Sequence, residues 1–314
     1  MADSANIARH LPLMAARQPD HPAVKIPRGR TGERIDYLAL SFAELDAEVD
    51  AWGAHLAARG VRRGDRVLVM VRQGLPLIAA AFALFKLGAV PVIIDPGMGR
   101  ANFLACVARS RPRVLLGIPL AQGLSHVFRS AFASVEIRVW ASSSATARRG
   151  VAKAAAAAPP LADSAPGELA AILFNPALGM TTIVPELDPA KPAAVDPAKI
   201  LQAIRQEGVT NSFGSPTLWR KIAAHAAAAG ETLPTVRRIL MAGAPVPPAL
   251  WEQLPKLLPH GTAHSPYGAT ESLPVSSIAA AEVLGETAAL TLRGAGTCVG
   301  RPVPGVTVKV IALT

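Results

Sequence analysis

Residues 67–94 read VLVMVRQGLPLIAAAFALFKLGAVPVII, and their pattern determines the class of fold. The apolar run 67–71 is typical of a strand that is buried on both faces of a parallel sheet. A helix is predicted from about Pro76 to Gly88, because a glycine there can take the left-handed conformation that ends a helix. Residues 90–94 predict the next strand. A strand, a helix and a strand in this order predict a parallel sheet with helices on its faces.

The same alternation extends to both sides of this stretch. Before it, Ser41 and Glu44 have the spacing of a capping box, and apolar residues recur every three or four positions as far as Leu56. After it, residues 102–108 predict a helix and residues 114–118 predict a strand. The first half of the chain is therefore expected to form one α/β lobe.

A second α/β lobe is predicted beyond an Ala- and Pro-rich connector at residues 151–166. Asp196 and Pro197 can begin a helix that Gly208 ends. We therefore expect an α/β fold of two lobes, at about 1–165 and 166–314, with mostly parallel sheets. The further elements expected in the second lobe are a strand at 209–213, a helix from Pro216, a strand at 238–241 and a helix at 247–258.

Composition and charge exclude several classes of protein. The 314 residues are 51% apolar and 17% charged, which excludes a disordered chain and fits one large domain with sub-lobes or two domains. Residues 1–160 carry 21 Lys and Arg against 11 Asp and Glu, and residues 161–314 carry 11 of each, so the net charge of +10 lies in the first part. No aromatic residue interleaves with the basic turn at residues 59–66, as a base-stacking surface would require. We interpret the charge as a solvated surface and expect no nucleic-acid partner.

The sequence also bears on the cellular compartment. Cys106 and Cys298 are too few for a disulfide framework, and the N-terminus lacks the features of a signal peptide. Polar residues interrupt the most apolar stretch, residues 67–90, before it reaches 18 clean apolar positions. We therefore expect a cytoplasmic protein with no membrane span.

Several common catalytic motifs are missing from the sequence. Residues 97–99 read GMG after a strand, but Asn102 stands where a dinucleotide fingerprint needs Gly or Ala. Gly294, Gly296 and Gly300 miss the spacing of that fingerprint, so we interpret both patterns as turns. Of the seven histidines, His260 and His264 have H-x-x-x-H spacing, but no further Cys or His follows in the pattern of a zinc site, and no G-x-S-x-G nucleophile motif occurs.

The stretch with the most informative chemistry is Tyr267-Gly268-Ala269-Thr270-Glu271-Ser272. It follows a short segment that resembles a strand, and ligands of open α/β sheets bind beyond the carboxyl ends of strands. It offers an aromatic face for a base, a glycine that permits close backbone approach, a hydroxyl for a phosphate oxygen and a carboxylate for Mg²⁺. Six residues also match by chance, so the segments that accompany them matter.

Three further segments accompany this motif. Residues 241–245 read MAGAP, residues 300–305 read GRPVPG and residues 84–91 read LFKLGAVP. Taken in their order along the chain, 84–91, 241–245, 267–272 and 300–305, these segments resemble the core motifs of the adenylate-forming superfamily of acyl-CoA synthetases, luciferases and peptide-synthetase adenylation domains. Residues 94–100, IDPGMGR, with Cys106 resemble more specifically the β-lactone synthetases of bacterial olefin biosynthesis. The resemblance runs from about residue 10 to the end and implies the large N-terminal domain of the adenylate-forming fold.

The resemblance implies an ATP-dependent ligase that uses Mg²⁺. A carboxylic acid would attack the α-phosphate of ATP, giving acyl-AMP and pyrophosphate. Thr270 and Glu271 would be the catalytic residues, with Thr270 bonded to a phosphate oxygen and Glu271 holding Mg²⁺. Two further sets of residues would contact the adenine and the acyl group. They are Gly243, Ala244, Pro245, Tyr267 and Gly268 around adenine, and Phe213, Gly214, Asn175, Gly179 and Met180 at the acyl group.

The narrower resemblance implies a particular substrate. A long-chain 2-alkyl-3-hydroxy acid would be adenylated, and its own hydroxyl would close a β-lactone and expel AMP. A complex with other enzymes of the olefin pathway is compatible with this role. An alternative enzyme is a long-chain acyl-CoA synthetase, which would release product only with CoA. An alternative of another class is an inactive module that binds adenylate or serves in assembly.

The chain departs from the pattern of the superfamily in two places. A Ser/Thr/Gly-rich phosphate loop ending in Pro-Lys-Gly should follow the strand at 169–174, but Phe174 runs directly into Asn175. After residue 305 the sequence reaches Thr314 without the ribose-binding aspartate or the C-terminal lid domain with its catalytic lysine. Two pieces of family sequence therefore meet near residues 173–175.

Three explanations of these departures are open. They are a natural deletion, an artificial shortening, and the omission of mobile residues from a longer chain. We favour the third, because both missing parts are glycine-rich or hinged, and such segments are often mobile.

Overall fold

The computed structural model describes residues 6–94, 99–141, 179–187, 194–269 and 272–309. They belong to two compact units. The first unit comprises Met1–Gly29 and Asp36–Val184, and the second comprises Arg30–Ile35 and Pro185–Thr314. The units divide at residues 184 and 185, whereas residue 165, the boundary expected from the sequence, lies outside the described residues.

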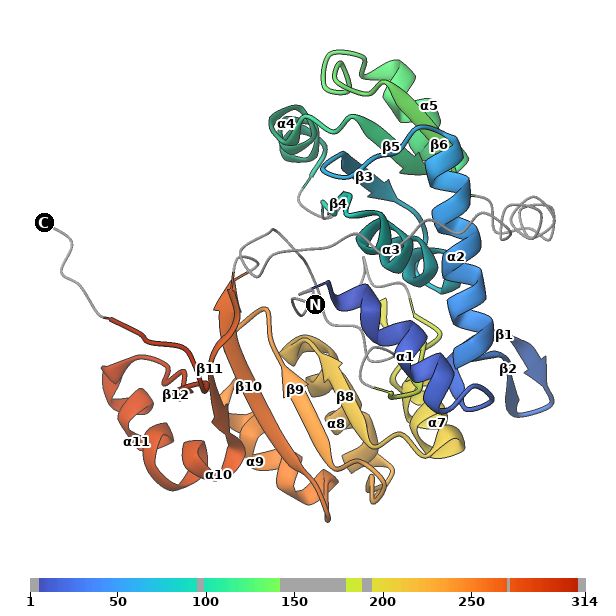
Figure 1. The fold of residues 1–314 in the computed structure, drawn as a ribbon. Coiled ribbons are helices and arrows are strands. Elements are labelled where there is room, and N and C mark those ends of the chain that lie inside the picture. Colours follow the sequence, from blue (N-terminus) through green and yellow to red (C-terminus); the bar gives the residue numbers. More distant parts are fainter. Residues whose placement is uncertain (1–5, 95–98, 142–178, 188–193, 270–271, 310–314) are drawn as a thin grey trace, which may run out of the picture. The chain divides into compact units, whose positions relative to one another are not determined.

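The first unit contains a four-stranded parallel sheet in the order β4-β3-β5-β6 (Figure 1). All three neighbouring pairs run parallel, as residues 67–94 predict. The expected strands at 90–94 and 114–118 are present but end at Val92 and Gly117. The strands are β3 (Arg66–Met70), β4 (Val90–Val92), β5 (Val114–Gly117) and β6 (Ile137–Trp140).

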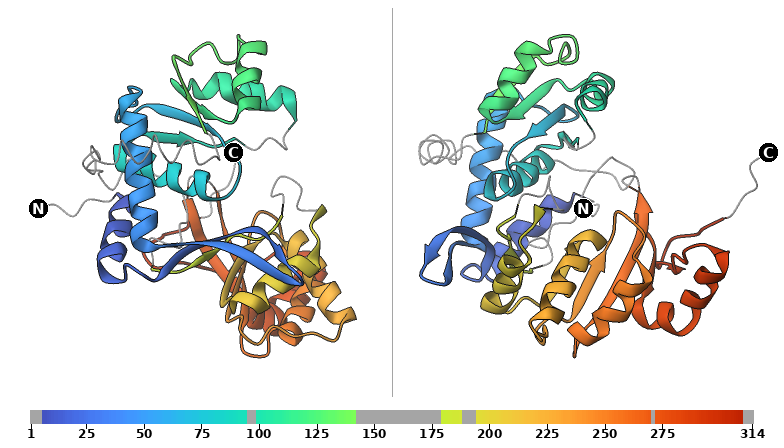
Figure 2. Two further views of the ribbon diagram at one scale, coloured as in Figure 1. Left: turned by 90° about the vertical axis from the view of Figure 1, so that its right-hand side faces the viewer. Right: turned by 180° about the vertical axis from the view of Figure 1, so that it is seen from behind.

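Helices cover both faces of this sheet. Val67 and Val69 pack in one apolar cluster with α2 (Phe42–Ala58) and α3 (Leu75–Leu87), which lie against each other in Figure 2. Leu68, whose side chain alternates to the other face, packs in a second cluster with residues of α4 (Arg100–Ser110). Burial on both faces explains why the strand sequence is continuously apolar.

The predicted helix ends are present. The Ser41 amide donates to Glu44 Oε2 at 2.8 Å, and the Glu44 amide donates to Ser41 Oγ at 3.2 Å, so the capping box forms. Gly88 ends α3 in the left-handed conformation, with φ of 69°. Two ends of the second unit also agree with the sequence, since Asp196 caps α7 (Pro197–Glu207) and Gly208 ends it.

Helix α5 (Pro119–Val127) reverses the usual distribution of polar and apolar side chains. Gln122 and Ser125 are buried, whereas Leu120 is 69% and Val127 is 73% exposed. The Gln122 amide donates to the Val139 carbonyl of β6 at 2.9 Å, so a hydrogen bond fixes the inner face of this helix.

The N-terminal part forms a short helix η1 (Ile7–Arg9), a helix α1 (His10–Arg17) and a hairpin that we did not predict. The hairpin strands are β1 (Pro22–Thr31) and β2 (Arg34–Ser41), and β7 (Thr182–Ile183) runs parallel to β1. The tip of the hairpin, Arg30–Ile35, belongs to the second unit. There the Ile35 amide donates to Gln206 Oε1 at 3.0 Å, and Gln206 Nε2 donates to the Ile35 carbonyl at 2.7 Å.

The second unit contains a five-stranded sheet in the order β12-β11-β10-β9-β8. The neighbours β8, β9 and β10 are parallel, whereas β11 and β12 are antiparallel to their neighbours. Only two residues separate β10 from β11, which is too short for a parallel crossover. The strands are β8 (Asn211–Gly214), β9 (Arg238–Met241), β10 (Thr262–Ala269), β11 (Ser272–Ala279) and β12 (Arg301–Pro302).

Three helices cover one face of this sheet, namely α7, α8 (Pro216–Ala228) and α9 (Pro248–Leu257) (Figure 1). Their apolar side chains form one core with inward residues of the strands, and Trp219 of α8 is completely buried in it. A helical stretch, residues 280–295, follows β11 and includes α10 (Ala280–Glu282) and α11 (Ala288–Leu290), with a kink at Gly294, whose φ of 90° is not helical. The segments Val283–Thr287 and Thr291–Ala295 within it are π-helical.

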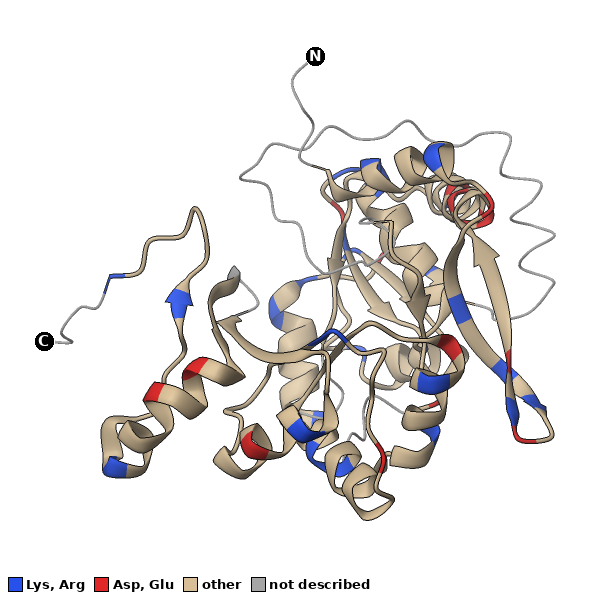
Figure 3. Cartoon of the chain, turned by 90° about the horizontal axis from the view of Figure 1, so that it is seen from below, with Lys and Arg blue, Asp and Glu red and all other residues tan. Residues whose placement is uncertain are grey.

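The charged residues agree with a solvated surface. Figure 3 shows Lys and Arg distributed over helices and the β1–β2 hairpin, with Asp and Glu among them. In the basic turn, Asp65 Oδ2 accepts hydrogen bonds from the Arg62 amide at 2.8 Å and from Arg113 Nη1 at 2.7 Å. Within the described part of the chain, no helix has the length and apolar character needed to cross a bilayer.

Candidate active site

The candidate site lies where the parallel strands of the second unit end. Gly214, the last residue of β8, pairs with Met241, the last residue of β9. The Ala242 amide donates to the Gly214 carbonyl at 3.3 Å, and Ser265 Oγ of β10 donates to the Met241 carbonyl at 3.1 Å. The loop that follows β9 therefore begins beside the end of β8 and beside Ser265 in the middle of β10.

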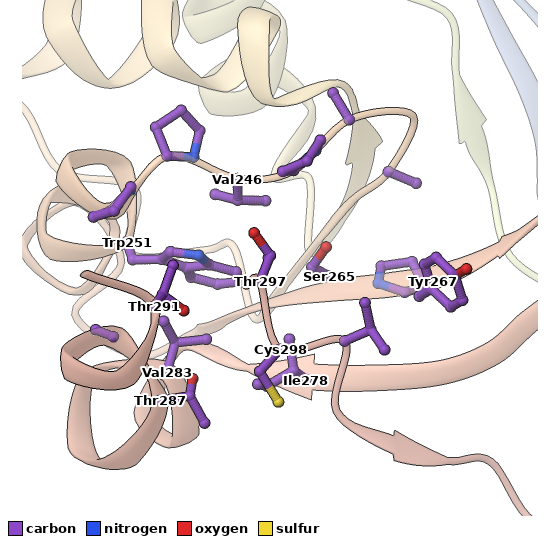
Figure 4. Close-up of a pocket in the computed structure, with 18 of the residues that line it drawn as sticks. Val246, Trp251, Ser265, Tyr267, Ile278, Val283, Thr287, Thr291, Thr297 and Cys298 are labelled. Atoms are coloured by element: carbon purple, nitrogen blue, oxygen red, sulfur yellow. The ribbon is translucent and has the colours of Figure 1, made fainter. Parts of the chain in front are cut away.

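A cavity of about 870 Å³ opens at this edge of the sheet (Figure 4). Its volume is in the range of small-molecule sites, about 300–1,000 Å³. Four segments form most of its lining, and Phe213 of β8, Trp251 and Glu252 of α9 and Ile278 of β11 complete it, so that apolar side chains predominate. The segments are the loop 242–248, residues 265–268 of β10, the helical residues 283–291 and the loop 297–299.

Most of the predicted nucleotide residues line this one cavity. Gly243, Ala244 and Pro245 lie on the loop after β9, and Tyr267 and Gly268 lie on β10. The Tyr267 side chain is 54% exposed, so its ring is accessible to a ligand. Two segments more than 20 residues apart in the sequence are thus brought together as expected. Their roles as adenine contacts stay predictions.

Of the described residues predicted to contact the acyl group, Phe213 lines the cavity, whereas Gly214, Gly179 and Met180 do not. Phe213 is 54% exposed, whereas Gly214 is buried. Gly179 and Met180 belong to the first unit, where the Gly179 carbonyl accepts a hydrogen bond from Gln18 at 3.1 Å.

Three predicted residues lie outside the described part of the chain. They are Thr270, Glu271 and Asn175, together with the junction expected near residues 173–175. Among the described residues, no three His, Cys, Asp or Glu side chains are grouped so that they could hold a metal ion. The magnesium site expected at Glu271 therefore stays a prediction.

One wall of the cavity was missed by our reading of the sequence. Val283, Thr287 and Thr291 line it from the helical stretch 280–295. These positions are four residues apart, which places them along one side of a helix, and this spacing was the available signal. The π-helical turns were not detectable from the sequence, although such turns are frequent at functional sites.

The loop 297–299 is fixed to the sheet behind it. Ser276 Oγ of β11 donates to the Val299 carbonyl at 2.7 Å, and Thr291 Oγ1 donates to the Gly296 carbonyl at 2.8 Å. Gly300 has φ of 81°, and a Cβ atom there would lie 2.0 Å from the Ser277 carbonyl oxygen. Only glycine fits this position, because the backbone packs directly on β11.

His264 of β10 is a titratable side chain of this sheet whose pKa is shifted. Burial, and to a smaller extent Arg238, lower the pKa of His264, while Glu282 acts in the opposite direction. The imidazole Nε2 lies 2.9 Å from Thr262 Oγ1. The neutral form of His264 is therefore favoured.

The family of this chain is established by a match to the model of the AMP-binding enzymes, over residues 13–175 and 167–312. The chain belongs to the AMP-binding enzyme family. The two matched segments overlap at residues 167–175, close to the place where two pieces of family sequence were expected to meet.

Two relatives within the AMP-binding enzyme family have the same description. The chain is 36% identical to the olefin β-lactone synthetase of Xanthomonas campestris pv. campestris and 37% identical to that of Stenotrophomonas maltophilia, over 100% and 98% of its length. It is also 28% identical, over 84% of its length, to a feruloyl-CoA synthase of a Streptomyces species. The chain spans 65% of the length of each β-lactone synthetase. The predicted resemblance is confirmed.

The Xanthomonas alignment also bears on the missing phosphate loop. It runs over 367 positions, more than the 314 residues of this chain, although it includes the whole chain. The relative therefore has residues inside the aligned region for which this chain has no counterpart.

Two solved structures share the fold of this chain. VinN in complex with L-aspartate has a TM-score of 0.74 and 17% identity, covering 99% of this chain and 86% of VinN. The N-terminal domain of FACL13 from Mycobacterium tuberculosis has a TM-score of 0.68 and 17% identity, covering 89% of this chain and 80% of that domain. The predicted fold, the large N-terminal domain of adenylate-forming enzymes, is confirmed.

Proposed function

We propose that this chain is the large domain of an ATP-dependent ligase that activates a carboxylic acid as acyl-AMP. The observation that supports this proposal most directly is the shared cavity. It joins the loop Gly243–Pro245 to Tyr267 and Gly268 at the carboxyl ends of parallel strands, where open α/β sheets bind their ligands. Membership of the AMP-binding enzyme family points to the same chemistry.

The lining of the cavity suits a nucleoside. Its walls are mainly apolar, which fits a planar base, and the Tyr267 ring is exposed so that a base can stack on it. Gly243 and Gly268 have no side chain between the ligand and the backbone. In the proposal, the adenine lies between Gly243–Pro245 on one side and Tyr267 and Gly268 on the other.

The phosphates would extend from the base toward Thr270 and Glu271, the residues that follow β10. Thr270 would donate its hydroxyl hydrogen to a phosphate oxygen, and Glu271 would hold Mg²⁺. A bound Mg²⁺ would neutralise charge on the phosphates. Because the acid supplies its own nucleophile, the protein mainly positions the carboxylate in line with the α-phosphate, with Phe213 beside the acyl group.

For the substrate, we propose a long-chain 2-alkyl-3-hydroxy acid. The acid carboxylate attacks the α-phosphate and releases pyrophosphate, and the β-hydroxyl then attacks the activated carbonyl, loses its proton and releases AMP. The product is a β-lactone. Similarity to two olefin β-lactone synthetases over nearly the whole chain supports this choice, and it implies a cytoplasmic enzyme that acts beside others of an olefin pathway.

A long-chain acyl-CoA synthetase is the second candidate, favoured by the similarity to feruloyl-CoA synthase. The two differ in whether a thiol is needed. The protein should be incubated with ATP, Mg²⁺ and a 2-alkyl-3-hydroxy acid, first without and then with CoA, and the products identified by mass spectrometry. Lactone and AMP without CoA support the first candidate, and an acyl thioester formed only with CoA supports the second.

Two variants connect the result to the proposed site. Glu271→Gln should abolish most AMP formation, because the amide is a poorer ligand for Mg²⁺. Glu286→Gln is the matched control, since Glu286 is exposed on the helical stretch and does not line the cavity. ATP binding without any AMP formation by the unaltered protein would indicate an inactive adenylate-binding module instead.

A further inference from the structure

The cavity extends beyond the residues proposed to flank the adenine. Past Tyr267 it is closed by the helical stretch 280–295 and by the loop 297–299. If the phosphates lie toward Thr270, the base is the part of the nucleotide that enters this region. The edge of the base remote from the ribose must then face the wall formed by residues 283–299.

Three hydroxyl groups line this wall, from Thr287, Thr291 and Thr297. Thr291 Oγ1 already donates to the Gly296 carbonyl at 2.8 Å. Thr297 has no side-chain hydrogen-bond partner within the described residues, and its side chain is exposed to the cavity. In Figure 4 the Thr297 hydroxyl points toward Val246, on the opposite side of the cavity.

The position of Thr297 is fixed from both sides. The preceding residue, Gly296, is bonded to Thr291, and Val299 is bonded to Ser276 of β11. The close packing of Gly300 on β11 prevents the loop from shifting toward the sheet. A hydroxyl held in this way can select a ligand, because little side-chain freedom is lost when the ligand binds.

We propose that Thr297 is a specificity-determining residue that binds the edge of the adenine carrying the 6-amino group. The inference rests on the proposed function. The walls formed by Val246, Trp251 and Ile278 are buried and apolar. The polar side chains of Glu252 of α9 and Ser265 of β10 also line the cavity, and the Ser265 hydroxyl is already bonded to the Met241 carbonyl. Thr297 Oγ1 would accept a hydrogen from the 6-amino group and can donate its own to the ring nitrogen N1.

The test compares ATP with purine riboside triphosphate, which lacks the 6-amino group, by isothermal titration. Thr297→Val removes the hydroxyl at nearly constant volume, Thr297→Ser keeps it, and Thr217→Val on α8 is a matched control outside the cavity. The unaltered protein should bind ATP about two- to tenfold more tightly than purine riboside triphosphate, as one hydrogen bond contributes.

In Thr297→Val this preference should fall below about twofold, through weaker binding of ATP, while Thr297→Ser and Thr217→Val keep it. Thermal unfolding of each variant checks that it is folded. An unchanged preference in a folded Thr297→Val protein overturns the role of Thr297 and leaves the proposed function standing. Failure of the unaltered protein to bind ATP contradicts the proposed function itself, and the inference with it.

Discussion

Alanine at position 300 should separate the loop that carries Thr297 from strand β11. The Cβ atom of Gly300→Ala would lie 2.0 Å from the Ser277 carbonyl oxygen, and real Cβ contacts are essentially never shorter than 3.0 Å. The oxygen belongs to the backbone of β11, so it cannot rotate away. The loop must therefore move, and the cavity loses part of its wall.

The size of the effect follows from what holds the loop in place. Alanine at a φ of 81° costs roughly 1–2 kcal/mol even without a clash. Detachment gives up the bond from Ser276 to Val299 and the bond from the Val303 amide to the Val275 carbonyl, at about 1 kcal/mol each. Because an overlap of a full ångström with the backbone costs more than that, the detached form should predominate. If fewer than about one molecule in ten keeps the loop attached, nucleotide affinity falls at least tenfold.

The matched control is Gly305→Ala. Gly305 has φ of 83° but no atom within 4 Å of a Cβ, so it shares the strain and lacks the clash. ATP affinity measured by isothermal titration should fall at least tenfold in Gly300→Ala and less than about threefold in Gly305→Ala. Equal affinities in the two variants would show that the packing of Gly300 on β11 does not shape the cavity.

Three further predictions concern stability. Burial, and then Asp50, raise the pKa of Asp46, whose Oδ1 is buried without a hydrogen bond from a described residue. Asp46→Asn should therefore raise the urea midpoint at pH 7, whereas Glu286→Gln, at an exposed position, should leave it unchanged. Because the pKa of His264 is lowered on folding, the unfolded chain binds more protons than the folded chain, and stability falls as the pH drops below about 6.5. His264→Gln should therefore flatten the slope of the unfolding free energy against pH. An unchanged slope would contradict this role of His264. Phe82 is completely buried, so Phe82→Ala should cost about 3–5 kcal/mol in denaturant unfolding, and a cost below about 1 kcal/mol would contradict the packing.

Much of the fold was predictable because local signals agree with the final packing. The capping box at Ser41, the terminating Gly88 and the apolar run 67–71 each specify one element, and their order specifies parallel pairing. The β1–β2 hairpin was not predictable, because its register depends on long-range contacts such as the one between Ile35 and Gln206. Helix α5 was also not predictable, since its inner face is marked by a hydrogen-bonded Gln122 and not by a stripe of large apolar residues.

The candidate site was predictable where it depends on strand ends and not where it depends on tertiary contacts. The loop at Gly243 follows β9 and Tyr267 lies near the end of β10, and the sheet brings them to one cavity. Thr297 precedes an edge strand of two residues, and it reaches the cavity only because Gly300 packs on β11. No local pattern encodes that contact.

The hairpin has a consequence for how the protein is made. Its tip belongs to the second unit, and Ile35 is 171 residues before its partner Gln206. At about 5–20 residues per second, the ribosome needs roughly 10–30 s to synthesise that interval. Until residues 186–206 are synthesised, the tip lacks its partners Glu186, Gln202 and Gln206, and residues 185–314 alone do not make up the second unit. A single cut between residues 184 and 185 would therefore leave residues 30–35, which belong to the second unit, on the first fragment.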